Sequence, residues 1–89
     1  MIILVGNMFY VYHLQSLSAL NERYIGFTED LKNRLASHNR GESTHTRKHL
    51  PWELVGYHAF RDRQTAIEFE SYLKSGSGRA FANKRLWPE

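Results

Sequence analysis

Cysteine is absent from the 89-residue sequence. Disulfide bridges and thiolate metal sites are therefore excluded as sources of stability. A long apolar run is also lacking, because the stretch at residues 1–5 is far too short to cross a bilayer. We therefore expect no membrane partner. The absence of cysteine is compatible with a reducing cytoplasm, where we expect the protein to reside.

A strong charge of either sign is missing too. The formal net charge is only +3, and the sequence pI is near 9.5. This mild excess of base weakly favours a polyanionic partner. A chain of this length forms one domain with a modest core, burying roughly 60–65% of its unfolded surface. We interpret residues 1–8 as a leader or a short edge strand and residues 9–87 as the folded domain. No protein partner is evident, and the oligomeric state is open.

Runs of aromatic and β-branched residues predict the strands. In the first run Val11 and Tyr12 fall on opposite faces, as alternation requires. Polar residues 15–22 predict a hairpin turn, and Gly26 in the return strand indicates a bulge or a close approach. Three strands are predicted in all, at residues 9–14, 23–27 and 52–60.

Helical spacing and capping residues predict three helices. Thr28 is expected to cap the first, with Asp30 in its first turn and Gly41 at its end. Asp62 is expected to cap the second, at residues 63–75.

A Gly-Ser-Gly run at residues 76–78 is expected to interrupt the chain before a third helix at residues 79–86. In this last helix Ala80 and Phe81 are expected to face inward. The order β-β-α-β-α-α predicts an α+β fold, in which helices flank a small three-stranded antiparallel sheet.

A few side chains could carry chemistry, although each also has an ordinary structural interpretation. Tyr12 and Tyr24 suit the packing of a sheet. Arg34 and His38 share one helix face, where Arg34 could pair with Asp30 and His38 could simply be packed. For Glu70, the ordinary structural interpretation is an exposed ion pair with Lys74, four residues later.

In their order along the chain, these residues resemble the GIY-YIG nuclease superfamily. The likeness is greatest to its small stand-alone members, which are similar to the N-terminal nuclease domain of the excision-repair subunit UvrC. It covers about residues 9–87. It lies in an ordered set of motifs: Tyr10-Val11-Tyr12, Tyr24-Ile25-Gly26, Thr28, Asp30-Leu31, Arg34-Leu35, His38-Asn39, residues 50–55, Ala66, Glu70, and Lys74-Ser75-Gly76-Ser77-Gly78-Arg79.

Two positions depart from the family pattern. Tyr10 stands where the first triad has glycine. Gln15 lies near the place where many members carry a lysine shortly after the tyrosine, so one phosphate contact is expected to be missing. Neither departure falls on a residue that the resemblance assigns to the chemical step.

The resemblance implies a GIY-YIG endonuclease fold and a divalent-metal-dependent endonuclease that hydrolyses DNA phosphodiester bonds, in DNA repair or recombination. It implies Mg²⁺ or Mn²⁺ held by Glu70, because one carboxylate suits an ion that keeps several waters. Tyr12 is expected to act as general base and Arg34 as a phosphate clamp. The catalytic set that it implies is Tyr12, Tyr24, Arg34, His38, Glu70 and Asn83.

Contacts with DNA are expected from cationic side chains, which bind the phosphate backbone electrostatically. The residues expected to do so are Arg40, Arg47, Lys48, Lys74 and Arg79. His45 and His49 suggest zinc, but the sequence offers no two further ligands at a suitable spacing. Two other functions stay open: a nucleic-acid-binding module of the same fold without turnover, and a structural or adaptor domain.

Overall fold

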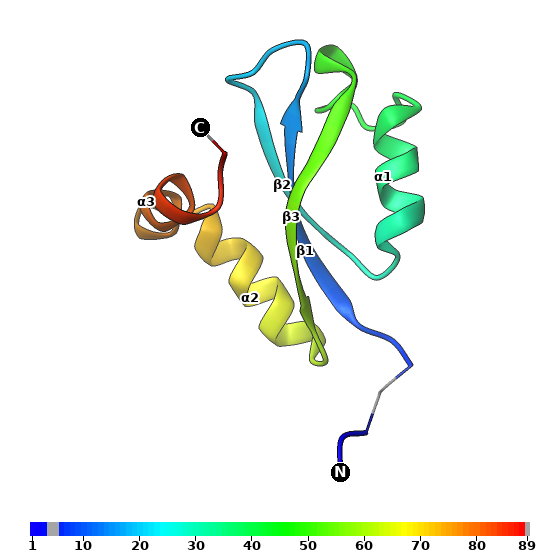
Figure 1. Cartoon of the computed structure of the whole chain (residues 1–89), viewed down its shortest axis with the longest axis vertical. Coiled ribbons are helices and arrows are strands. Elements are labelled where there is room, and N and C mark those ends of the chain that lie inside the picture. The colour runs from blue at the N-terminus through cyan, green and yellow to red at the C-terminus, as the bar shows by residue number, and fades with distance from the viewer. Residues whose placement is uncertain (4–5, 89) are drawn as a thin grey trace.

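A three-stranded antiparallel sheet with the order β2-β1-β3 forms the centre of the fold (Figure 1). The structure is a computed structural model that describes residues 1–3 and 6–88. The strands are β1 (Phe9–Ser16), β2 (Arg23–Thr28) and β3 (Trp52–Phe60). The predicted sheet is thus confirmed, although β1 extends two residues further than expected. The reason is local, because the Ser16 hydroxyl accepts hydrogen bonds from the backbone N–H groups of Ser18 and Ala19 and so closes the turn.

Helices cover both faces of this sheet (Figure 1). One face carries α1 (Leu31–Asn39), and the other carries α2 (Arg63–Leu73) and α3 (Gly76–Arg85). A short 3₁₀ turn, η1 (Arg47–His49), lies in the polar loop before β3. The observed order of strands and α-helices is the predicted β-β-α-β-α-α. None of the helices in the described residues is long and apolar enough to span a membrane.

Alternation along β1 divides the interior into two cores. Val11 packs with residues of α2 and α3, including Ala66 and Ala82. Its neighbour Tyr12 points to the opposite face, where it packs with Trp52 and with partly buried residues that include Leu35 of α1. The prediction that Val11 and Tyr12 lie on opposite faces is therefore confirmed.

The cap of α1 differs from the prediction. Asp30, rather than Thr28, is its N-cap, and the Asp30 side chain accepts a hydrogen bond from the Asn33 backbone N–H. Thr28 acts one step earlier, because its hydroxyl accepts a hydrogen bond from the Asp30 N–H. The predicted end of the helix is confirmed: Gly41 has φ of 78°, and its N–H donates to the His38 carbonyl.

The Gly-Ser-Gly run is the first turn of α3 and not an interruption before it. Helix α2 ends at Leu73, and Ser75 caps α3 by accepting a hydrogen bond from the Gly78 N–H. A Cβ on Gly78 would lie only 1.6 Å from the Tyr72 carbonyl oxygen. The glycine is therefore needed where two helices approach closely. The earlier start also changes which residues face inward: Ala82 is buried, whereas Ala80 and Phe81 are exposed.

The segment before β1 forms no strand in the residues that the structure describes there, which are 1–3 and 6–8. Residues 4 and 5, which belong to the predicted leader or edge strand, lie outside the described part of the chain. At the other side of the sheet, β3 forms the second edge.

Candidate active site

The ring of Tyr12 lies directly against Gly26 of the neighbouring edge strand. The two residues are register partners in the β1–β2 pair. A Cβ on Gly26 would lie 2.4 Å from the Cζ and hydroxyl oxygen of Tyr12, so only glycine leaves room for this ring. The predicted close approach at Gly26 is thus confirmed, and it directs the tyrosine hydroxyl across β2 toward α1.

The Tyr12 hydroxyl is held between two side chains of α1. Arg34 Nε donates a hydrogen bond to it at 3.3 Å, and its oxygen lies 2.8 Å from His38 Nε2. We assign the phenol proton to the bond with His38 Nε2, because Arg34 has no lone pair that could accept it. Arg34 thus reaches this hydroxyl, while its alternative partner Asp30 bonds to Asn33 instead.

Both ring nitrogens of His38 have partners in the interior. His38 is fully buried, and its Nδ1 lies 2.7 Å from the hydroxyl oxygen of Thr46. With Nε2 accepting from Tyr12, Nδ1 carries the hydrogen and donates it to Thr46. The result is an ordered chain of hydrogen bonds from Arg34 through Tyr12 and His38 to Thr46.

Burial keeps every group in this chain of hydrogen bonds neutral, except the Arg34 guanidinium. Burial raises the pKa of Tyr12 to about 12, outweighing the hydrogen bond from Arg34, which acts in the opposite direction. Burial, with a smaller contribution from the Arg34 charge, lowers the pKa of His38 to about 4. In the protein alone, the Arg34 guanidinium is therefore not enough to favour the Tyr12 phenolate. Instead, a neutral phenol faces a neutral imidazole that can accept its proton.

Thr46 is the site residue that the sequence did not indicate. It is fully buried, although it lies in a polar loop between His45 and Arg47. Its carbonyl accepts a 2.6 Å hydrogen bond from the Trp52 indole, which fixes the loop against β3. Only a long-range contact with His38 gives this threonine its place, and a lone threonine in a polar loop carries no local signal of that contact.

Tyr24 joins the cluster from β2. Its ring centroid lies 5.1 Å from that of His38 and 6.2 Å from that of Tyr12. The half-buried ring also lines a hollow of about 400 Å³ that extends from His45 and His49 of the polar loop to Lys74 of α2. Groups from both faces of the sheet therefore meet beside Tyr24, at the exposed edge of β2.

Glu70 faces this same edge from α2. Its carboxylate lies 3.2 Å from Lys74 Nζ, so the surface pair weighed from the sequence is present. The Glu70 charge also contributes to the raised pKa of Tyr12. Among the described residues, no group of three or more acidic, histidine or cysteine side chains could hold a metal. A single half-buried carboxylate fits an ion such as Mg²⁺, which keeps most of its waters and binds substrate phosphate.

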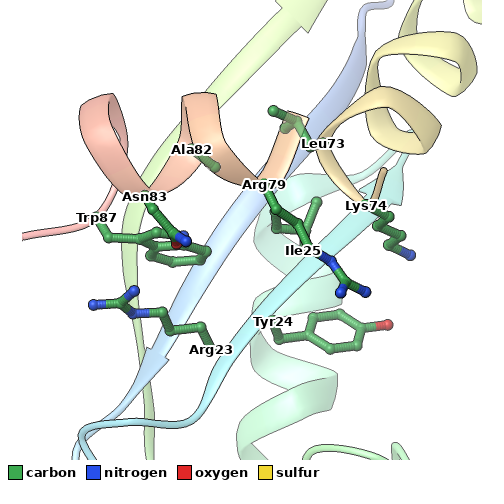
Figure 2. Close-up of a pocket in the computed structure, with 9 residues that line it drawn as sticks. All are labelled: Arg23, Tyr24, Ile25, Leu73, Lys74, Arg79, Ala82, Asn83 and Trp87. Carbon is green, nitrogen blue, oxygen red and sulfur yellow. The ribbon is translucent and has the colours of Figure 1, made fainter. Parts of the chain in front are cut away.

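The remaining residues of the predicted site lie in three places. Asn83 and Arg79 of α3 lie near Tyr24 and Lys74, around a second hollow (Figure 2). Arg47 and Lys48 are exposed on η1. Arg40, just after α1, is bound to Glu42 at 3.0 Å, and both side chains are more than half exposed. The structure thus gathers every predicted catalytic residue at or near the β2 edge, whereas Arg40 engages an acidic neighbour.

A known protein family matches most of this chain. The GIY-YIG catalytic domain family matches residues 8–85. The chain belongs to this family. The family is one of nucleases. The α+β fold of three antiparallel strands and three helices is that of the family.

Individual relatives carry names that state no activity. Two curated UPF0213 proteins of Streptococcus pyogenes, from serotypes M5 and M3, are each 40% identical over 58 residues. The match covers 64% of this chain and 63% of each relative, so it spans less than two thirds of their length. The solution NMR structure of a UPF0213 protein from Bacillus halodurans is 28% identical, with a TM-score of 0.53. It covers 92% of this chain and 88% of the other.

Proposed function

We propose that this protein is a divalent-metal-dependent endonuclease that hydrolyses DNA phosphodiester bonds. The observation that carries the proposal is the Tyr12 hydroxyl, which lies between the Arg34 guanidinium and a neutral His38 acceptor. A buried phenol needs one hydrogen-bond partner in any case, whereas Tyr12 has two, and one of them is cationic. Membership of a nuclease family supplies the substrate class.

Proton transfer from the attacking water follows the hydrogen-bond chain. Tyr12 takes a proton from the water while its own proton moves to His38 Nε2. The tyrosine thus stays neutral, as its raised pKa requires, and His38 becomes a transient imidazolium, since its own pKa is about 4. Thr46 accepts the Nδ1–H of His38 throughout, which keeps Nε2 directed at Tyr12. This route makes Tyr12 the general base and His38 the proton acceptor behind it.

Arg34 stabilises the charge that develops on the phosphate. Its Nε–H is engaged by Tyr12, which leaves the terminal nitrogens of the planar guanidinium for phosphate oxygens. Glu70 would hold Mg²⁺ or Mn²⁺, and when bound the ion supplies positive charge to the phosphate and to the leaving oxygen. Tyr24 orients the water or the phosphate from the β2 edge.

A DNA-binding module of the same fold without turnover is the second candidate. Two observations favour it: Glu70 is paired with Lys74, and burial holds the Tyr12 pKa near 12. Both make the protein alone a poor catalyst. A substrate phosphate bound between Lys74 and Arg34 would free Glu70, because Lys74 would then pair with a phosphate oxygen instead of the Glu70 carboxylate. Roles in DNA repair or recombination and a cytoplasmic location stay predictions from the sequence.

The deciding experiment incubates the purified protein with labelled single-stranded, duplex and branched DNA, with and without Mg²⁺ or Mn²⁺. We expect cleavage only with the ion. Glu70→Gln should abolish it while DNA affinity and fold are kept, because the change removes a charge and keeps the shape. Glu68→Gln is the matched control, since Glu68 is an exposed carboxylate on the same helix. Full activity in Glu70→Gln would exclude the metal role, and binding without cleavage under all conditions would favour the second candidate.

A further inference from the structure

A second hollow adjoins the candidate active site and shares Tyr24 with it (Figure 2). It lies between the β2 edge and α3 and has a volume of about 380 Å³. This is within the range of pockets that take small organic ligands, roughly 300–1,000 Å³. Of its lining residues, the function proposed above uses only Tyr24 and Lys74.

The lining is divided by chemistry. Its floor is apolar and comes from Ile25, Leu73 and Ala82, of which the last two are almost fully buried. Lys74 and Arg79 are cationic and lie on the side of Tyr24, with the Arg79 guanidinium beside the tyrosine ring in Figure 2. The positive charge is thus concentrated at the end of the hollow that adjoins the tyrosine.

The opposite end carries an aromatic ring and an amide. Trp87 lies there with the Asn83 side chain next to its ring (Figure 2). Arg23 covers the indole, with its guanidinium carbon 5.1 Å from the ring centroid. The two are in cation–π contact at the rim, and both indole and guanidinium planes are surfaces on which nucleobases stack. An amide next to such a stack can bond to the edge of a base.

We propose that this hollow binds one unpaired nucleotide next to the phosphodiester bond that is cleaved. The phosphate lies at Arg79 and Lys74, and the base stacks on the Trp87–Arg23 pair with its edge toward Asn83. This inference rests on the proposed function and deepens it by naming the substrate class. The substrate is DNA with an unpaired nucleotide at the cleavage position, such as a single strand or a flap.

Size and direction favour an unpaired nucleotide over continuous duplex. A hollow of this volume takes one nucleotide and not a base pair. A base inside a duplex is stacked on both sides and must leave the helix before it can enter such a pocket, whereas an unpaired base has little to give up. The cations lie nearer the tyrosine than the indole does, so one nucleotide can place its phosphate at the active site and its base at Trp87.

The test measures binding without metal ions, so that it does not depend on cleavage. A 12-nucleotide strand carrying 2-aminopurine, a fluorescent base that is quenched on stacking, is titrated as a single strand and as a duplex. We expect the wild-type protein to bind the single strand more tightly and to quench it. Trp87→Leu should weaken single-strand binding by about 5–100-fold, the usual worth of one stacked base, and should lose the quenching. Trp87→Phe should restore most of both.

Two further variants separate stacking from damage to the fold. Phe81→Leu removes an exposed aromatic side chain from α3, outside the hollow, and should bind like wild type. Asn83→Ala changes an exposed residue and should weaken binding of the single strand without loss of helix content. Equal affinity of wild type for single strand and duplex would overturn the proposal, and so would wild-type quenching in Trp87→Leu. Absence of cleavage with these binding results intact would instead refute the proposed function alone.

Discussion

The two faces of the sheet bury a histidine each and treat it in opposite ways. On the α1 face, His38 has a partner at both ring nitrogens, Tyr12 and Thr46. On the α2 face, His13 has only His58, at 3.2 Å, and its Nδ1 is the one buried side-chain nitrogen or oxygen without a partner in the described residues. The difference indicates that the α1 face, and not the α2 face, is arranged to hold and transfer a proton.

Packing differs between the faces in the same sense. The core below α2 and α3 is built from aliphatic and phenylalanine side chains around Val11. The core below α1 places Tyr12 and Trp52 at its centre, and their hydroxyl and indole N–H bond to α1 and to the polar loop. A buried polar network costs stability unless every member has a partner, and here Tyr12, His38 and Thr46 all have one. One face thus mainly stabilises the fold, and the other also arranges reactive groups.

The largest effect that we expect is on the rate of cleavage, from a substitution at Tyr12 in the centre of the α1 face. Tyr12→Phe removes one oxygen and keeps the ring against Gly26. We expect cleavage to slow by about 10²–10⁴-fold, the usual worth of general-base catalysis. Single-turnover rates at saturating DNA measure this directly. An unchanged rate would remove Tyr12 from the mechanism and leave His38 as the candidate base.

The matched change on the other face alters the adjacent residue of β1. Val11→Ala removes two buried methyl groups and should lower the free energy of unfolding by about 2–3 kcal/mol, from lost transfer energy plus a small cavity. Urea denaturation measures this loss. Cleavage by the folded fraction should stay near wild type. A large loss of activity per folded molecule would show that the two faces are not separable.

Substitutions at Thr46 test a single hydrogen bond of the α1 face. Thr46→Val replaces the hydroxyl with a methyl group of similar shape, so the buried Nδ1–H of His38 loses its acceptor. We expect a stability loss of about 1–3 kcal/mol for the unpaired donor. Cleavage should slow as well, because His38 then favours the tautomer that cannot accept from Tyr12. Thr46→Ser should rescue both. A stability loss with unchanged cleavage would make Thr46 purely structural.

Acid should weaken the fold through both buried histidines. Burial lowers the pKa of His13 and of His38 to about 4. Between that value and about 6.5, the unfolded pKa, the unfolded chain binds more protons than the native protein. Stability is therefore full above pH 6.5 and falls as the pH drops toward 4. His13→Phe should make this fall shallower in urea denaturation at pH 7 and pH 4.5. An equally steep fall in the variant would contradict the assignment.

What the sequence could predict follows from short-range physics. Alternation assigned Val11 and Tyr12 to opposite faces, and Gly41 was correctly placed at the end of α1. The predicted start of α3 was wrong. Glycines break isolated helices, but here glycine is required at residue 78 by the contact with the Tyr72 carbonyl. That contact joins two helices and leaves no mark in either helix's own spacing.

The candidate site was predictable only as far as the family motifs extend. Those motifs gave Tyr12, Arg34 and His38, which the structure brings into one hydrogen-bonded chain. They did not give Thr46 or Trp87, whose places depend on how a loop and the C-terminal segment return to the sheet. Nor could the sequence predict the direction of the Tyr12 pKa, because residue types do not reveal that burial outweighs the guanidinium.

The contact between Gly26 and the Tyr12 ring makes the two positions epistatic. A Cβ at residue 26 has no room while the ring lies 2.4 Å from where it would be, so the glycine is intolerant of change in this background. Once residue 12 is shortened, the same substitution fills space instead of colliding. The order of substitution therefore matters: a lineage that loses the tyrosine first opens position 26 to drift, and restoring the tyrosine later requires the glycine again.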